Sequence, residues 1–318
     1  MQREWIVRIA KMYYFDNMSQ QAIADELGIS RSNISRLLKR SHEMGIVNIQ
    51  INDVSVRAFR VAENLKEEFN LKNVVIAPSH SEMEINTANI GYYAAKYLEG
   101  IMKDNMKIGV SWGSSVFHVI RNLPPVDNIG VEIVQMMGGV SWSDSYKYGV
   151  KLIIEFAERI EGSARLLNAP LILQDKKLHD RLMEETGIKA HMDIIRQCDI
   201  ALVGIGTNKQ EFSTMVMANS ILAEESSRMW DRGVISHICG RPLDENGKEC
   251  VGGLDDRVIS VKLADIKLIP EVIAVAGGNY KVKPIIAALR GGYINTLVTD
   301  EKTALSVMKY AMNGGVKD

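Results

Sequence analysis

From about residue 54 onward the sequence alternates between short apolar runs and longer amphipathic segments, and this alternation constrains the fold more than any other feature. Strands are predicted at 73–78, 107–112, 132–139, 164–170, 200–206, 271–278 and 294–300. Amphipathic helices are predicted between most of them, for example at 84–103 and 146–160, and a connecting helix at 57–69 comes first. Because parallel neighbours need helical crossovers, the pattern predicts an α/β domain with a Rossmann-like, largely parallel sheet covered by helices on both faces.

Four of these strands end in small residues. The stretches are GVSWGSS at 109–115, MMGG at 136–139, VGIG at 203–206 and AVAGG at 274–278. In open α/β sheets, ligands bind beyond the carboxyl ends of the strands, so we expect these four ends to form one ligand site. None fits the P-loop pattern, and no complete G-x-G-x-x-G stands at a strand-to-helix turn, which disfavours ATP and dinucleotides.

The GVSWGSS stretch has two interpretations. It fits G-x-S-x-G, the turn that exposes a nucleophilic serine in hydrolases, with Ser111 as the nucleophile. It also fits a loop that wraps a phosphate, where small residues let the backbone approach and the next helix points its N-terminus at the anion. A hydrolase needs a histidine and an acid after Ser111, and His179, His191 and His237 meet that order without a recognisable local context.

Lys281, in AGGNYKVKPIIAAL, stands at or just before the start of a helix predicted over 281–290. A lysine at a helix N-terminus is unfavourable because the helix dipole prefers negative charge there, and a bound phosphate would remove the conflict. Asp255, in GGLDDRVIS, either binds sugar hydroxyls or belongs to a polar turn.

The first fifty residues predict a helix-turn-helix. A helix is expected at 5–15, and residues 19–41 (SQQAIADELGISRSNISRLLKRS) then predict two short helices joined by a tight turn. Ser19 and Ser30 are expected N-caps, and Gly28 is expected to adopt a positive φ. The predicted buried positions are Ala22, Ile23, Leu27, Ile34, Leu37 and Leu38, with small Ala24 at the helix crossing. A strand or wing is expected at 46–51.

The other face of the second short helix is basic and polar. It carries four basic residues and no acidic one between positions 31 and 40. Ser, Asn and Arg side chains near the helix start can reach base edges in the major groove, and the later basic residues can hold phosphates. The predicted DNA-binding residues are Gln20, Arg31, Ser32, Asn33, Ser35, Arg36, Lys39 and Arg40.

The 318 residues suffice for two domains, which we place at 1–53 and 54–318. Three widely spaced cysteines indicate neither a disulfide framework nor a zinc site, and the six histidines show no ligand spacing, so no metal is expected. No apolar run approaches the ~20 residues that span a bilayer. These features favour a cytoplasmic protein without a membrane partner.

With the helix-turn-helix at one end, followed in order by GVSWGSS, MGG, VGIG, AVAGG-x-x-K and LRGGYINTLVTDEKTA, the chain resembles the SorC/DeoR family of sugar-responsive bacterial transcription regulators. The match runs from about residue 5 to 312. It implies an effector domain similar to sugar-phosphate isomerases and coenzyme A transferases, which binds phosphorylated sugars without turning them over. No catalytic residue and no cofactor are then expected.

The resemblance also implies the effector-binding residues. Around the phosphate or its sugar it places Ser111, Gly113, Ser114, Ser115, Gly277, Gly278 and Lys281. Around the rest of the ligand it places Gly138, Gly139, Asn168, Pro170, Gly204, Gly206 and Asp255. This chain departs from the family at Ser236-His237, where Gly-Asp is common, and Met137 offers no amine for a Schiff base with an aldehyde.

These observations predict a transcription factor with three kinds of partner: operator DNA, a phosphorylated sugar or related metabolite, and further copies of itself in a homodimer or homotetramer. DNA-binding helices of this kind act in pairs on half-sites, which is why at least a dimer is expected. A sugar-phosphate isomerase-like enzyme fused to a DNA-binding domain remains an alternative, as does a serine hydrolase using Ser111. Both directions of control, an effector that relieves DNA binding and one that promotes it, stay open.

Overall fold

The computed structural model describes residues 2–47, 56–125, 129–140 and 149–312. The chain divides into two compact units, Met1–Asp53 and Val54–Asp318. Among the described residues, no helix is long and apolar enough to cross a membrane.

The described part of the first unit, residues 2–47, forms three helices: α1 (Gln2–Tyr14), α2 (Gln20–Leu27) and α3 (Arg31–Glu43). The side chain of Ser19 accepts a hydrogen bond from the Ala22 backbone, and that of Ser30 accepts one from Asn33, so both predicted N-caps are confirmed. Gly28 ends α2 with φ 67°, a left-handed conformation that suits glycine. The predicted helix-turn-helix is therefore present.

A small apolar core holds these helices together. Its buried members are Ile9, Met12, Ile23, Ala24, Ile34 and Leu38. Leu27 and Leu37 are partly buried against it, whereas Ala22 is exposed, so the prediction that Ala22 belongs to the buried face was wrong. Ala22 lies in the first turn of α2, where its backbone N–H donates to the hydroxyl of the Ser19 cap. Positions 48–51 of the predicted wing lie outside the described residues.

The second unit is built on a sheet of nine strands within the described residues. Their bounds are β1 (Asn73–Ala77), β2 (Lys107–Val110), β3 (Glu132–Gln135), β4 (Ser163–Arg165), β5 (Ile200–Thr207), β6 (Val234–Ile238), β7 (Arg241–Asp244), β8 (Glu271–Val275) and β9 (Thr296–Asp300). The order β1-β9-β8-β5-β2-β3-β4 is parallel throughout, as predicted. The central strand β5 is buried along nearly all of its length, as expected for a strand covered on both faces.

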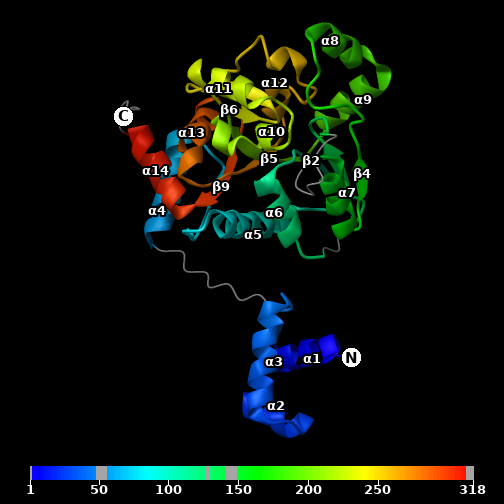
Figure 1. Cartoon of the computed structure of the whole chain (residues 1–318), viewed down its shortest axis with the longest axis vertical. Coiled ribbons are helices and arrows are strands. Elements are labelled where there is room, and N and C mark those ends of the chain that lie inside the picture. The colour runs from blue at the N-terminus through cyan, green and yellow to red at the C-terminus, as the bar shows by residue number, and fades with distance from the viewer. Residues whose placement is uncertain (1, 48–55, 126–128, 141–148, 313–318) are drawn as a thin grey trace. The chain divides into compact units, whose positions relative to one another are not determined.

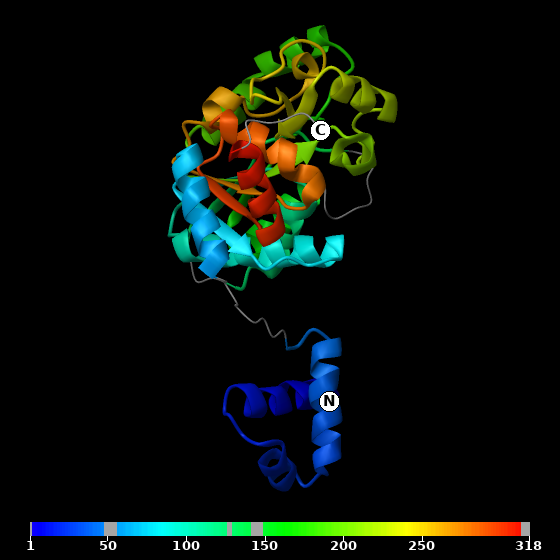
Figure 2. The same ribbon diagram turned by 90° about the vertical axis from the view of Figure 1, so that its left-hand side faces the viewer.

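Helices cover both faces of this sheet. They are α4 (Val56–Phe69), α5 (Met83–Ile101), α6 (Ser114–Asn122), α7 (Val150–Arg159), α8 (Lys176–Glu184), α9 (Thr186–Ile195), α10 (Thr214–Met217), α11 (Ala223–Asp231), α12 (Leu263–Ile266), α13 (Val282–Arg290) and α14 (Glu301–Met312). Figure 1 shows α5 and α6 together on one side of the sheet, and α13 on the other. In Figure 2, α4 and α14 lie side by side, and α14 also packs against α13.

The hairpin of β6 and β7 was not predicted. It pairs antiparallel with the end of β5, where Gly206 lies opposite His237. Its two-residue loop, Cys239-Gly240, has φ values of 50° and 78°, as a type I′ turn requires. Cys-Gly is a weak signal for such a turn compared with Asn-Gly, which explains why the sequence pattern did not reveal the hairpin.

Candidate functional site

In the first unit, α3 separates an apolar face from a basic one. Ile34 and Leu38 point into the core, so the opposite face is left to solvent. Of the predicted DNA-binding residues, the exposed ones are Arg31, Ser32, Ser35, Arg36, Lys39 and Arg40, and Gln20 and Asn33 are half-buried. The structure therefore gathers seven of the eight on one helix, with Gln20 at the start of α2.

Local hydrogen bonds order the start of this face. The Arg36 Nη2 donates to Asn33 Oδ1 at 2.9 Å, and the Ser30 and Ser32 hydroxyls lie 3.0 Å apart. In the described part of the chain, none of the four basic residues forms an ion pair with a carboxylate. Their charges are thus available to the phosphates of a nucleic acid.

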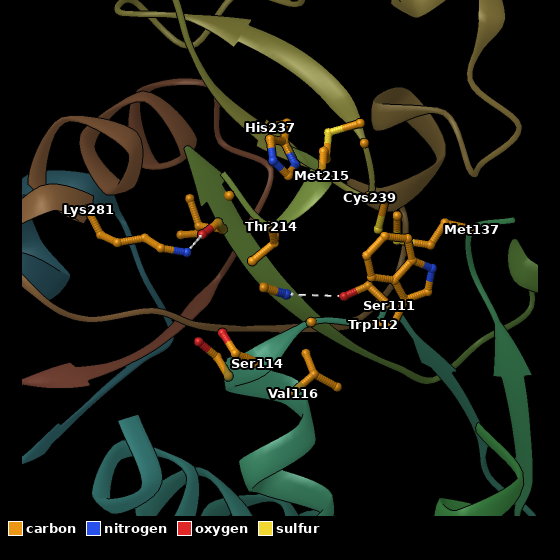
Figure 3. Close-up of a pocket in the computed structure, with 16 residues that line it drawn as sticks. Ser111, Trp112, Ser114, Val116, Met137, Thr214, Met215, His237, Cys239 and Lys281 are labelled. Carbon is orange, nitrogen blue, oxygen red and sulfur yellow. Dashed lines mark hydrogen bonds between the residues drawn. The ribbon is translucent and has the colours of Figure 1, made fainter. Parts of the chain in front are cut away.

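In the second unit, a pocket lies at the carboxyl ends of β2 and β5 (Figure 3). Its outline encloses about 430 Å³, a figure that includes space open to solvent. The predicted effector-binding residues that line it are Ser111, Gly113, Ser114, Ser115, Gly204, Gly206 and Lys281. Three separate stretches of sequence therefore meet there: the loop after β2, the end of β5 and the turn after β8.

The loop after β2 leads directly into α6. Gly113 is the N-cap residue with φ 145°, a backbone conformation that side chains rarely allow. Because the first turn of a helix has backbone N–H groups without helical partners, Ser114 and Ser115 bring both N–H donors and hydroxyls to the pocket. The start of α6 is accordingly suited to an anion.

Ser111 holds this loop to the neighbouring strand. It is almost completely buried, and its Oγ accepts a hydrogen bond from the Gly204 N–H at 3.2 Å. Within the described residues, no histidine is hydrogen-bonded to Ser111. The hydrolase interpretation therefore lacks the serine–histidine pair that its chemistry needs.

Lys281 supplies the positive charge in the pocket. It follows β8 through a short 3-10 turn, Asn279–Lys281, and is the N-cap residue of α13. The side chain is 7% exposed, and its Nζ donates to the backbone oxygen of Ile205 on β5. Burial lowers the pKa of Lys281 to about 8, because an ammonium group loses its hydration there.

Several residues of the pocket were not among the predicted site residues. They are Trp112, Val116, Met137, Ile205, Thr214, Met215, His237, Cys239 and Gly240. Burial raises the pKa of the Cys239 thiol to about 12, so the sulfur lines the pocket as a thiol and is a poor nucleophile. The sequence offered one signal for His237, the departure from the family pattern at Ser236-His237.

Four predicted effector-binding residues, Gly138, Gly139, Asn168 and Pro170, lie where the segment after β3 meets the segment before α8. A Cβ on Gly138 would come within 2.5 Å of the Pro170 carbonyl, and Gly139 pairs with Pro170 in a β-bridge. Asn168, two residues before Pro170, is exposed. These residues do not line the pocket, although Gly138 supports it because its oxygen accepts a 2.9 Å hydrogen bond from Trp112 Nε1.

The other predicted residues outside the pocket anchor loops. Asp255 forms an ion pair with buried Arg241, with 2.6 Å between Oδ1 and Nη1. The Gly278 N–H donates to Asp300 Oδ2 at 3.1 Å, and Gly277 packs so closely on Asp300 that a Cβ would lie 2.6 Å from that oxygen. Asp300 thereby fixes the Gly-Gly turn that precedes Lys281.

Comparison with known proteins identifies relatives of both units. Residues 55–309 match the family described as "Putative sugar-binding domain", and residues 8–43 match "Sigma-70, region 4". The chain is 32% identical to the deoxyribonucleoside regulator of Bacillus subtilis, covering 95% of this chain and 96% of the relative. It is 33% identical to the sorbitol operon regulator of Klebsiella pneumoniae, covering 96% and 97%.

The crystal structure of the full-length sorbitol operon regulator SorC from Klebsiella pneumoniae superposes with a TM-score of 0.80 and 32% identity. The match covers 96% of this chain and 98% of that chain. These relatives are transcriptional regulators, not enzymes.

Proposed function

This chain belongs to the SorC/DeoR family of sugar-binding transcriptional regulators, and on that premise we propose that a phosphorylated sugar, bound in the pocket at Lys281, controls its binding to operator DNA. Residues 1–53 serve as the DNA-binding domain, and residues 54–318 bind the effector and form the oligomer, a homodimer or homotetramer. The regulated genes belong to carbohydrate or nucleoside metabolism, as the names of the relatives suggest. The protein acts in the cytoplasm, where DNA and sugar phosphates are both present.

One observation favours a phosphate ester as the effector. The buried ammonium of Lys281 and the N-terminal turn of α6 line the same pocket. An isolated buried charge is costly, and an anion that meets both the ammonium and the free N–H groups offsets that cost. A phosphate group fits because it carries a charge of about −1.5 to −2 and accepts several hydrogen bonds at once.

The DNA-binding role follows from the face of α3. Its exposed serines and Arg36 lie near the helix start, where side chains of a recognition helix reach base edges, and Lys39 and Arg40 lie farther along, suited to backbone phosphates. Two copies of α3 in a dimer would read two half-sites.

A binding experiment tests the link between the two activities. A duplex selected by the protein from a random-sequence library is labelled, and its affinity is measured by fluorescence anisotropy with and without each member of a set of sugar phosphates. One phosphate ester should change the affinity about 5- to 150-fold, the usual range of coupling between sites. If no phosphate ester changes the affinity of an otherwise active protein, the pocket does not control DNA binding.

A further inference from the structure

His237 occupies a fixed position in the pocket. It lies on β6 opposite Gly206 of β5, and its imidazole ring covers that glycine so closely that a Cβ there would come within 1.9 Å of the ring carbon Cε1. The side chain is 7% exposed. A ring held against a backbone in this way has little freedom to turn toward another partner.

The ring nitrogen Nε2 of His237 is buried and has no hydrogen-bond partner among the described residues. Buried polar groups are nearly always paired, and leaving one unpaired costs about 1 to 3 kcal/mol. Because His237 lines a pocket, a bound ligand can supply the partner that the protein does not.

Charge in the pocket is limited. Among the described residues that line it, Lys281 is the one lysine or arginine, and there is no aspartate or glutamate. Burial and the nearby charge of Lys281 lower the pKa of His237 to about 3, so the imidazole is neutral at physiological pH. One positive charge and one helix N-terminus can offset a single phosphate, whereas a second buried anion would stay unpaired.

The position of His237 separates it from the start of α6. Figure 3 shows His237 and Ser114 at opposite sides of the pocket, with Lys281 reaching in from a third side. A phosphate at the N-terminus of α6 therefore leaves His237 to contact the sugar.

We infer that His237 is a specificity-determining residue: its Nε2 forms a hydrogen bond with an uncharged hydroxyl or carbonyl oxygen of the sugar, and the site selects phosphate monoesters that carry no second charge. This inference rests on the phosphate site proposed above. It excludes sugar bisphosphates and phosphorylated sugar acids as effectors.

Titration calorimetry of the full-length protein tests the selectivity. The ligands are inorganic phosphate, hexose 6-phosphates and pentose 5-phosphates, each sugar phosphate accompanied by its bisphosphate and by its phosphorylated aldonic acid. The best monophosphate should bind at least about 10-fold more tightly than either charged counterpart, because a second unpaired anion costs more than one hydrogen bond returns.

Two substitutions test the residue. His237→Leu should weaken binding of the best monophosphate about 10-fold and leave inorganic phosphate within about twofold of wild type, because the imidazole that it removes contacts the sugar. His237→Gln keeps a neutral hydrogen-bonding group and should retain most of the affinity. Unfolding midpoints of both variants establish that they are folded.

The outcomes distinguish failure of the proposed phosphate site from failure of the role inferred for His237. A wild-type protein that binds neither inorganic phosphate nor any phosphate ester overturns the phosphate site, and the inference with it. Tight binding of a bisphosphate or a phosphorylated sugar acid overturns the inference alone. The same holds if His237→Leu leaves monophosphate affinity unchanged, or lowers affinity for inorganic phosphate equally.

Discussion

Lys281 is placed where its charge is costly to the free protein. Its ammonium is buried, its partner is the backbone oxygen of Ile205 rather than a carboxylate, and its pKa falls to about 8. Functional sites commonly keep such groups at the expense of stability. If the proposed function is correct, the residue links two measurable properties, the affinity for phosphate and the free energy of unfolding.

Lys281→Met should separate these two properties. We expect affinity for the sugar phosphate to fall by about 1.5 to 3 kcal/mol, the scale of a charge-assisted hydrogen bond. The free energy of unfolding near pH 7 should rise by about 1 to 3 kcal/mol, because the buried charge is gone. Calorimetric binding and denaturant unfolding give both values, and DNA binding by the free protein should not weaken. Unaltered affinity for every phosphorylated ligand would remove Lys281 from the site.

The pH dependence of binding has a definite sign. Affinity for the sugar phosphate should be highest between about pH 6 and about pH 8. Above about pH 6 the phosphate is a dianion, and below about pH 8, the pKa of Lys281 in the free protein, the lysine carries its proton. Above pH 8 affinity should fall by up to about 10-fold per pH unit, because the ligand then has to recruit a proton to Lys281. Between about pH 8 and 10.5 the free energy of unfolding of the ligand-free protein should rise with pH. In this range Lys281 has lost its proton in the folded protein but still holds it in the unfolded chain, so each rise in pH disfavours the unfolded state. In Lys281→Met the fall in affinity above pH 8 should be absent.

At the scale of single elements, the sequence predicted what is locally encoded. The caps Ser19 and Ser30, the turn at Gly28 and the basic face of α3 follow from short-range patterns, and the structure has all of them. The β6–β7 hairpin depends on long-range pairing with β5 and on a Cys-Gly turn without a strong signal of its own. The hairpin brings His237 and Cys239 to the pocket, so these two were missed with it.

The basic face of α3 can be tested one residue at a time. Arg36→Ala or Lys39→Ala should weaken operator binding and lower the slope of log affinity against log salt by about 1 for each phosphate that the variant no longer neutralises. Effector affinity should stay at its wild-type value. Lys103→Ala removes an exposed charge from the other unit and serves as the control. Loss of DNA binding and effector binding together would indicate misfolding and defeat the assignment.

The packing of β6 on β5 can be tested with two glycines of the same strand. Gly206→Ala would put a Cβ within 1.9 Å of the His237 ring, whereas a Cβ at Gly204 has its nearest neighbour at 4.0 Å. Gly206→Ala should lower the free energy of unfolding by about 1 to 3 kcal/mol, and Gly204→Ala should change it by less than about 1 kcal/mol. Chemical denaturation measures both. Equal effects would show that the ring does not pack on Gly206 as described.

At the scale of the whole molecule, the order of elements was predictable and the detailed lining of the site was not. Alternating strands and helices favour a parallel sheet, and its geometry places the ends of β2, β5 and β8 at one edge. Which glycines line the pocket depends on packing: Gly204 and Gly206 line it, whereas Gly138 packs on Pro170. A glycine at a strand end signals that some group approaches the backbone closely, but it does not identify that group.

The central claim is that a phosphorylated sugar binds in the pocket at Lys281. Its most direct test is thermal unfolding of the purified protein with a panel of sugar phosphates, each paired with its unphosphorylated sugar. We predict that one phosphate ester at ~100 times its dissociation constant adds about 2.7 kcal/mol of stability, that its unphosphorylated partner adds none, and that Lys281→Met removes the effect. If no phosphate ester raises the midpoint, or if the unphosphorylated sugars raise it equally, Lys281 and the start of α6 do not hold a phosphate.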